Sequence, residues 1–528
     1  MIDKPRWFDS ELEAVVLLES SLRDMLPPGL SESWPEMSSD QAMSTLVFCG
    51  VGQLYLLSRS AWEKQRAFGL PPSDRLQRRK FYAEMKGTGV VECELPSGVE
   101  VPEETAFVLD LTTMAKYAVR EGFACYGGCA FFAKDKRLLA IYNCQSRRLL
   151  TAPSYHSLEW ENAKFTIKAS IISMATLREH LMYCHWIVSN RCGISSREEL
   201  HADHPVRRIL ALFTFRSGSI NFTSTITLMQ ENMLLHRASP LEQHGVLDAF
   251  EDMAATWRFQ TFPEMVAAKE IPEEDGDDVS LPYLEDGTAC WAVFHQFFTS
   301  YIDLYYGEGE AGDRAVQNDP EIQAYWGSLE RVSSVRWQPE EPGQEYARPG
   351  ELMGAIEGEG RSFVGKFNGY GLPNALCDKA ALINQLTHTA FWVCGMHEFA
   401  GNIVEYFESP NFCATKVYAN GPNGPNTQTQ ADVQTFLQNL CVVGSTGYKL
   451  PDLVSDWKRL LLEDDCGADE RFVGKRQAVE ALHDNFMREL VDLGEAIEER
   501  NAGPRAQGLH GREFMSFDPR TFECSVSI

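Results

Sequence analysis

Two histidines five residues apart in an apolar run constrain this chain more than any other feature. His180 and His185 lie in LREHLMYCHWIVSN, whose apolar spacing predicts a helix over residues 177–190. On a regular α-helix five residues turn through about 500°, which leaves the two imidazoles about 140° apart. A shared metal ion would therefore need a local π-type widening of the helix, a feature that favours functional sites. Without it, one histidine is buried and satisfied and the other is exposed.

A second apolar run, residues 382–407, repeats the same spacing with His397 and Asn402. His388 lies in this run too, but nine residues separate it from His397, so at most one of these two histidines can face a common site. The chain ends on Ile528, whose α-carboxylate is ionised at any working pH and is a further oxygen donor. The alternative for Ile528 is a frayed terminus, as in most chains.

Three imidazoles, one amide oxygen and one carboxylate leave a six-coordinate metal with an open position. Such mixed donors suit non-haem iron, with manganese next. Zinc does not normally take five protein ligands. If both pairs lie on widened helices and the terminal carboxylate is buried, one metal site would be made of His180, His185, His397, Asn402 and Ile528.

The composition argues against several functions. A net charge of −27, from 75 acidic and 48 basic residues, disfavours nucleic acid and anionic membranes as partners. We find no apolar run of 18 residues and no basic leader, so we expect no transmembrane segment and a cytoplasmic location. Phosphate-loop and serine-hydrolase motifs are missing as well. Cys125 and Cys129, in CYGGC, are better explained as reduced thiols than as metal ligands.

Apolar residues at helical spacing dominate the chain, for example over residues 281–306 and 479–497, and predict a mainly α-helical protein. Short strand patterns at about residues 89–151 predict a small sheet near the N-terminal third. Residues before 89 read as helices and loops. Acidic, Pro- and Gly-rich segments look like surface loops and do not separate regions of different composition. We therefore expect residues 1–528 to form a single domain.

Six segments of the chain resemble, in order, those of the lipoxygenase family. CAFFAKDKRLLAIYNC followed by Trp160, Ala163 and Lys164 is similar to the family's strand pair and "W..AK" helix start. HLMYCHWIVSN is similar to its iron helix, and His204-Pro205, Arg216 and Ile220-Asn221 to the stretch that follows. The other matching segments are LPYLEDGTACWAVF with YIDLYYGE and VQNDPEIQAYW, LTHTAFWVCGMHEFAGNIVEY, FMRELVDLGEAIEERN and the terminal SVSI.

The resemblance implies a lipoxygenase-like helical catalytic domain around a non-haem iron, without the family's N-terminal β-sandwich. In that family an iron-bound hydroxide abstracts a bis-allylic hydrogen from a polyunsaturated fatty acid, and O2 adds to give a hydroperoxide. Carried over residue by residue, the iron ligands are the five residues named above. The implied partners are a polyunsaturated fatty acid and O2, and we expect a monomer or a small homo-oligomer.

The second iron helix departs from the family's pattern. The family places its Asn four residues after the histidine, and that position is Gly401 here. Asn402 is the preferred ligand because Asn402 to Tyr406 matches the family's "NFGQY", which implies a one-residue insertion. Glu405 replaces the glutamine that tethers the Asn ligand in the family, so it is a candidate second-layer residue that tunes the metal.

The first iron helix also departs from the pattern. An ungapped count from Ala163 and Lys164 puts the first ligand on Ala175, which cannot bind metal, and the second on His180. The pair His180 and His185 is preferred because it completes the site, at the cost of a five-residue insertion.

Two further residues are candidates for the substrate and O2 channel. Counting along the chain from Asn221 places Met233 at the position where the family has a Gly or Ala that admits O2. Arg216 is a candidate partner for a fatty-acid carboxylate. The departures leave two other functions open. One is a lipoxygenase-like iron enzyme repurposed for hydroperoxide rearrangement or for a substrate other than a fatty acid. The other is a non-catalytic lipid-binding protein that has lost a metal ligand, which the Ala175 register would favour.

Overall fold

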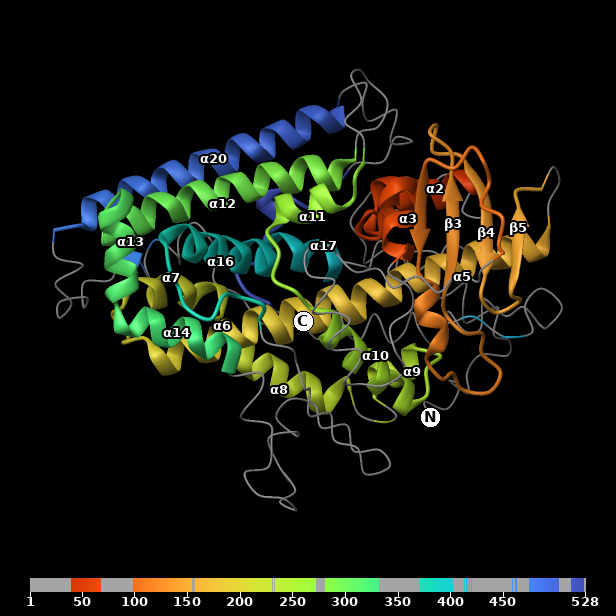
Figure 1. Cartoon of the computed structure of the whole chain (residues 1–528), viewed down its shortest axis with the longest axis horizontal. Coiled ribbons are helices and arrows are strands. Elements are labelled where there is room, and N and C mark those ends of the chain that lie inside the picture. The colour runs from red at the N-terminus through yellow and green to blue at the C-terminus, as the bar shows by residue number, and fades with distance from the viewer. Residues whose placement is uncertain are drawn as a thin grey trace, which may run out of the picture.

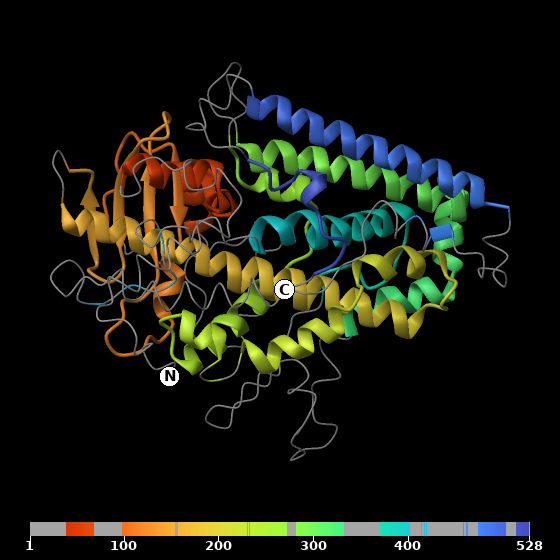
Figure 2. The same ribbon diagram turned by 180° about the vertical axis from the view of Figure 1, so that it is seen from behind.

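The computed structural model describes residues 39–67, 98–153, 157–229, 231, 233–271, 281–331, 370–401, 474–502 and 514–526, with a few isolated positions between 413 and 462. Helices make up most of this part of the chain, and one five-stranded sheet lies at one end of the molecule (Figures 1 and 2). The predicted class, mainly α with a small sheet near the N-terminal third, is confirmed.

The described elements are, in chain order, α2 (Asp40–Cys49), η1 (Val51–Leu54), β1 (Leu56–Ser58), α3 (Arg59–Ala67), β2 (Phe107–Asp110), η2 (Thr112–Lys116), β3 (Gly128–Phe132), β4 (Leu138–Asn143), β5 (Arg148–Thr151), α5 (Leu158–Met174), η3 (Ala175–Ser189), α6 (Asn190–Glu199), α7 (Pro205–Phe213), α8 (Ser217–Thr227), α9 (Leu234–Ala238), α10 (Gln243–Thr256), α11 (Phe262–Ala268), α12 (Pro282–Tyr306), α13 (Gly309–Asn318), α14 (Pro320–Arg331), α16 (Lys379–Phe391), η4 (Trp392–Met396), α17 (His397–Gly401), α20 (Arg476–Ala502) and η7 (Pro519–Thr521).

The sheet is antiparallel throughout and its strands pair in chain order, β1 to β5. Strands β2 to β5 lie in the region where the sequence predicts them. Strand β1 does not, because it falls in a segment that we expected to hold helices and loops. A strand of three residues is too short to show the alternation of apolar and polar residues that identifies strands in a sequence.

Both faces of the sheet are packed, as alternate side chains of a strand point to opposite faces. On one face Phe131 meets Trp62 of α3, with ring centroids 5.9 Å apart. On the other face Phe132 meets Phe48 of α2, at 5.2 Å. Helix α5 lies close to the sheet, since a Cβ added to Gly128 would come within 2.5 Å of Ile167 Cδ1.

The "W..AK" motif joins α5 to α2. Trp160 Nε1 and Lys164 Nζ each donate to Asp40 Oδ1, both at 2.8 Å. The Lys164 side chain is only 3% exposed, so its charge needs this carboxylate and that of Glu161, 2.9 Å away.

Helices α5, η3 and α6 follow one another without a break and cross the middle of the molecule (Figure 1). Helices α16, η4 and α17 form a second unbroken run that packs against them, and Cys184 Sγ of η3 lies 3.4 Å from the carbonyl oxygen of Trp392 in η4. In both runs a π-helical segment is inserted, at η3 and at η4. These two segments position the site described below.

Helices α12 and α20 lie side by side along one edge of the molecule in both views (Figures 1 and 2). Their contact is aromatic, with Phe297 and Phe486 centroids 4.8 Å apart. Helix α12 also packs on α16 through Trp291 and Phe391, at 5.5 Å. None of the described helices is both long enough and apolar enough to cross a membrane.

Candidate metal centre

Three histidine side chains meet in the interior, where η3 passes η4 and α17. His180 Nε2 lies 3.1 Å from His397 Nε2, and His185 Nε2 lies 3.2 Å from His180 Nε2 and 3.1 Å from His397 Nε2. The residues are 7%, 1% and 5% exposed for His180, His185 and His397. Within the described ranges, they are the group of histidine, cysteine and acidic side chains whose ligand atoms come close enough to hold one ion.

The π-helical segment explains how two histidines five residues apart reach the same point. In a π-helix each backbone N–H bonds to the carbonyl five residues earlier, which brings residues five apart to one side of the helix. Segment η3, Ala175–Ser189, contains both His180 and His185. Ala175 begins this segment and is fully buried. It contributes no donor, so the structure brings His180 and His185 to His397 without a role for Ala175.

The spacing of the three nitrogens fits one common metal ion. Donors about 2.1 Å from a common ion lie about 3.0 Å apart at right angles and about 3.4 Å apart at tetrahedral angles. The observed 3.1 to 3.2 Å lies between these two values, so the three nitrogens are spaced to bind one common ion.

Asn221 of α8 fixes the orientation of the His185 ring. Its Nδ2 donates to the His185 carbonyl oxygen at 3.0 Å, so its Oδ1 is left to accept from His185 Nδ1, also at 3.0 Å. With the proton on Nδ1, His185 Nε2 keeps its lone pair for a metal. The sequence motif includes Asn221 but does not predict this orienting role. The two residues are 36 positions apart, so no local spacing could have revealed it.

Position 401 faces the histidine cluster but carries no side chain. It lies four residues after His397 in α17, on the same side of the α-helix. A Cβ added to Gly401 would lie 3.0 Å from His180 Nε2. Asn402 and Glu405, the predicted fourth ligand and its neighbour, lie outside the described residues.

The sequence itself matches a known family. The family model "Lipoxygenase" matches residues 142–352. Among curated proteins, residues of this chain are 23% identical over 191 positions to linoleate 13S-lipoxygenase 2-1 of Solanum tuberosum, and 25% identical over 192 positions to linoleate 9S-lipoxygenase 1 of Hordeum vulgare. These matches cover 34% and 33% of this chain, and 21% and 20% of the two relatives. The matched segment thus spans about a fifth of their length.

Solved structures extend the likeness to the whole chain. Coral 8R-lipoxygenase superimposes with a TM-score of 0.68 and 15% identity, covering 99% of this chain and 70% of that one. The chain is similar to the lipoxygenases in part of its sequence and in its fold. The manganese lipoxygenase of Gaeumannomyces graminis superimposes with a TM-score of 0.64 and 15% identity, covering 98% of this chain and 88% of that one. At these identities the solved lipoxygenases establish the fold and nothing finer.

The C-terminal segment of the chain enters the interior. Ser525 and Val526 are fully buried, and Ser525 Oγ donates to the Phe215 carbonyl oxygen at 2.7 Å. Ile528, the predicted fifth ligand, lies outside the described residues. The description of the chain stops two residues before it.

The two predicted channel residues are exposed, unlike the buried histidine cluster. Arg216 is exposed at the start of α8, where its φ is 53° and its guanidinium lies over the Phe215 ring. Met233 is 41% exposed just before α9. His388, as its spacing indicated, is not in the cluster. It is buried against Trp257 and Trp392, and burial lowers its pKa to about 3, so it is neutral.

Proposed function

We propose that this protein is a metal-dependent dioxygenase of the lipoxygenase type. It would remove a bis-allylic hydrogen from a polyunsaturated fatty acid and add O2 to give a hydroperoxide. The observation that carries the proposal is the triangle of Nε2 atoms from His180, His185 and His397, with edges of 3.1 to 3.2 Å, in a chain with this fold. Iron is the proposed metal and manganese the alternative, as the manganese lipoxygenase neighbour supports.

The residues of the chain have distinct proposed roles at this site. His180, His185 and His397 would hold the metal through Nε2, and Asn221 keeps the proton of His185 on Nδ1. A bound redox-active ion would supply the one-electron oxidation that hydrogen abstraction requires. Burial of all three rings keeps bulk water from the donors, which strengthens their interaction with a cation.

The remaining assignments complete the proposal. Asn402 and the carboxylate of Ile528 would be the fourth and fifth ligands, with Glu405 tuning the site from behind Asn402. Arg216 and Met233 are proposed for the path of substrate and O2. The names of the relatives, linoleate 9S- and 13S-lipoxygenases, support a polyunsaturated fatty acid as substrate. We further propose that residues 1–528 act as one catalytic domain.

Incubation of the iron-loaded protein with linoleic acid tests the function. We expect O2 uptake together with the ultraviolet absorbance of a conjugated diene. His397→Ala should abolish both signals, whereas His201→Ala, at a side chain that is 66% exposed, should leave them unchanged. The proposal fails if iron- and manganese-loaded protein with full metal occupancy gives neither O2 uptake nor diene with linoleic or arachidonic acid.

A further inference from the structure

The His180 ring lies against the backbone of Gly401, the last residue of α17. A Cβ placed on this glycine would lie 3.0 Å from Nε2, 3.2 Å from Cδ2 and 3.4 Å from Cε1 of His180. Contacts of this length are uncommon for a Cβ atom, so a side chain at position 401 would push the ring aside. The atom nearest to the added Cβ is Nε2, which is the nitrogen that faces the other two histidines.

The backbone at position 401 does not by itself require glycine. Gly401 belongs to α17 and is not among the glycines with positive φ, such as Gly371 at 92°. A glycine that ends a helix as a cap usually adopts the left-handed conformation with positive φ. Inside a helix, glycine is less favourable than alanine. The close approach of His180, and not the backbone conformation, is therefore what favours glycine here.

Two other imidazoles limit how far the His180 ring can shift. Its centroid lies 4.7 Å from that of His397 and 4.9 Å from that of His185, and both pairs meet edge to face. His180 is only 7% exposed, and protein interiors are packed closely enough that a displaced ring meets a neighbour. A ring pushed by a side chain at position 401 would press on another histidine or turn its Nε2 away from the common point.

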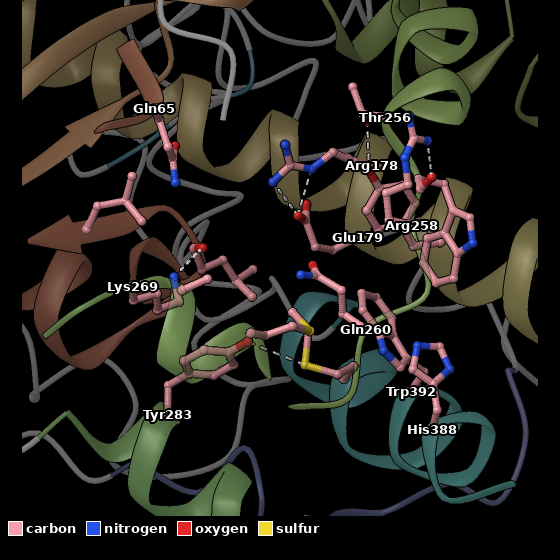
Figure 3. Close-up of a pocket in the computed structure, with 17 residues that line it drawn as sticks. Gln65, Arg178, Glu179, Thr256, Arg258, Gln260, Lys269, Tyr283, His388 and Trp392 are labelled. Carbon is pink, nitrogen blue, oxygen red and sulfur yellow. Dashed lines mark hydrogen bonds and ion pairs between the residues drawn. The ribbon is translucent and has the colours of Figure 1, made fainter. Parts of the chain in front are cut away.

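The backbone beside His180 is held as well. Glu179, the preceding residue in η3, lines a polar cavity of about 110 Å³ together with Arg178 and Lys269 (Figure 3). Arg178 Nε donates to Glu179 Oε1 at 2.7 Å, and Tyr55 Oη donates to Glu179 Oε2 at 2.6 Å. These bonds anchor η3 next to His180. We therefore expect a side chain at position 401 to move the His180 ring and not the segment that carries it.

A displacement of a few tenths of an ångström is large at a metal site. Distances between a metal and its protein ligands fall within about 0.2 Å of their standard values. His180 Nε2 lies 3.1 Å from His397 Nε2 and 3.2 Å from His185 Nε2, which is the spacing that suits one ion. An ion held by His185 and His397 would lose most of its bond to a displaced His180.

We propose that Gly401 is a positioning residue for the metal centre. Its missing side chain lets the His180 imidazole reach the same point as the imidazoles of His185 and His397. The inference rests on the proposed function for the role of the metal, whereas the contact between Gly401 and His180 belongs to the metal-free chain. The departure from the family's Asn at this position thus has a steric consequence, whichever residue supplies the fourth ligand.

Titration of the full chain with Mn²⁺, followed by the electron paramagnetic resonance of the free ion, tests the proposal. Gly401→Ala should weaken Mn²⁺ binding by at least about tenfold, the loss typical of residues that orient a ligand. Gly218→Ala is the matched control, because it adds the same methyl group to a helical glycine of α8 with no other atom within 4 Å of it. The control should bind Mn²⁺ as the wild type does. A Gly401→Ala chain that binds Mn²⁺ as tightly as the wild type would overturn the proposal.

A double-mutant cycle in the metal-free chain shows whether position 401 acts through His180. Gly401→Ala should lower the urea midpoint of unfolding in the wild-type background, because the new Cβ meets the ring. In a His180→Ala background the same substitution should raise the midpoint, because the ring is gone and alanine favours the helix.

The cycle also separates this inference from the proposed function. An equal shift of the midpoint in both backgrounds, in a chain that binds Mn²⁺, would overturn the role of Gly401 alone. A wild-type chain that binds neither Mn²⁺ nor iron would contradict the proposed function and this inference with it.

Discussion

The histidine cluster and the polar cavity lined by Arg178, Glu179 and Lys269 are both built on segment η3, but they differ in whether their polar groups are paired within the protein. His180 and Glu179 are neighbours in η3, yet one belongs to the cluster and the other to the cavity. In the cluster three nitrogen atoms converge at 3.1 to 3.2 Å. In the cavity Glu179 is satisfied by Arg178 and Tyr55.

This difference separates a ligand site from a structural ion pair. Under the proposed function the three Nε2 atoms present lone pairs to one point, and such an arrangement is stabilised by a bound cation. The Glu179 carboxylate accepts hydrogen bonds from Arg178 and Tyr55 and needs no ligand to balance its charge. We therefore expect it to contribute to the stability of the fold. Mutations on the two sides should accordingly change different quantities.

The largest effect should come from the cluster. His185→Ala removes one of three imidazole donors, and we expect metal affinity and diene formation to fall by more than about 100-fold, beyond the loss typical of residues that only support a ligand. The matched control is His388→Asn, which changes another buried histidine of the same helix pair. Metal content should be lost in the first variant and kept in the second. Equal metal content in the two variants would contradict the assignment of His185 as a metal ligand.

On the cavity side, Glu179→Leu should reduce stability strongly. Burial lowers the pKa of Arg178, but the charge of Glu179, the neighbouring Tyr183 and Tyr55, and the hydrogen bond to Glu179 together raise it by more and hold that pKa above its usual value. Loss of the carboxylate leaves a buried guanidinium without its counter-charge, which typically costs about 3–5 kcal/mol. Urea denaturation measures this loss. Tyr55→Phe, which removes one hydrogen bond to the same carboxylate, should cost only about 1–3 kcal/mol. An equal loss in both variants would contradict the ion-pair account.

Asn221 offers a finer test on the cluster side. Asn221→Leu removes the acceptor for His185 Nδ1, and we expect metal affinity to fall by about 10- to 100-fold. Asn221→Asp keeps an acceptor oxygen and should recover most of the affinity. If Asn221→Asp is as weak as Asn221→Leu, the residue acts through packing or through its other hydrogen bond and not by orienting the ring.

The smallest effect concerns Lys269 and pH. Burial, followed by the nearby charge of Arg178, lowers its pKa to about 7, while Glu179 acts in the opposite direction. An unfolded lysine keeps its proton up to about pH 10. Between these values the folded chain binds fewer protons than the unfolded chain, so stability should rise with pH, by at most about 1.4 kcal/mol per pH unit. The free energy of unfolding of the wild type relative to Lys269→Met should show this rise between pH 7 and 9. A flat difference would contradict it.

The parts of the site that depend on local sequence patterns could be predicted from the sequence, and the parts that depend on contacts between distant residues could not. The five-residue spacing of His180 and His185 requires a π-helical segment for a shared site, and both the spacing and the segment lie within one helix. The Asn221 contact and the cavity could not be found this way, because they join distant parts of the chain. Tyr55 and Glu179, for example, are 124 residues apart. Gly401 is an intermediate case: the sequence marks the position as unusual, and only the structure shows that it faces His180.

Metal analysis of the purified chain tests the central claim most directly. After reconstitution, elemental analysis should find about one iron or manganese per chain, and electron paramagnetic resonance should show it in a six-coordinate environment with nitrogen ligands. The same measurement on His397→Ala should find no bound metal. A wild-type chain that takes up neither ion, or a His397→Ala chain that holds the metal as tightly as the wild type, would contradict the account.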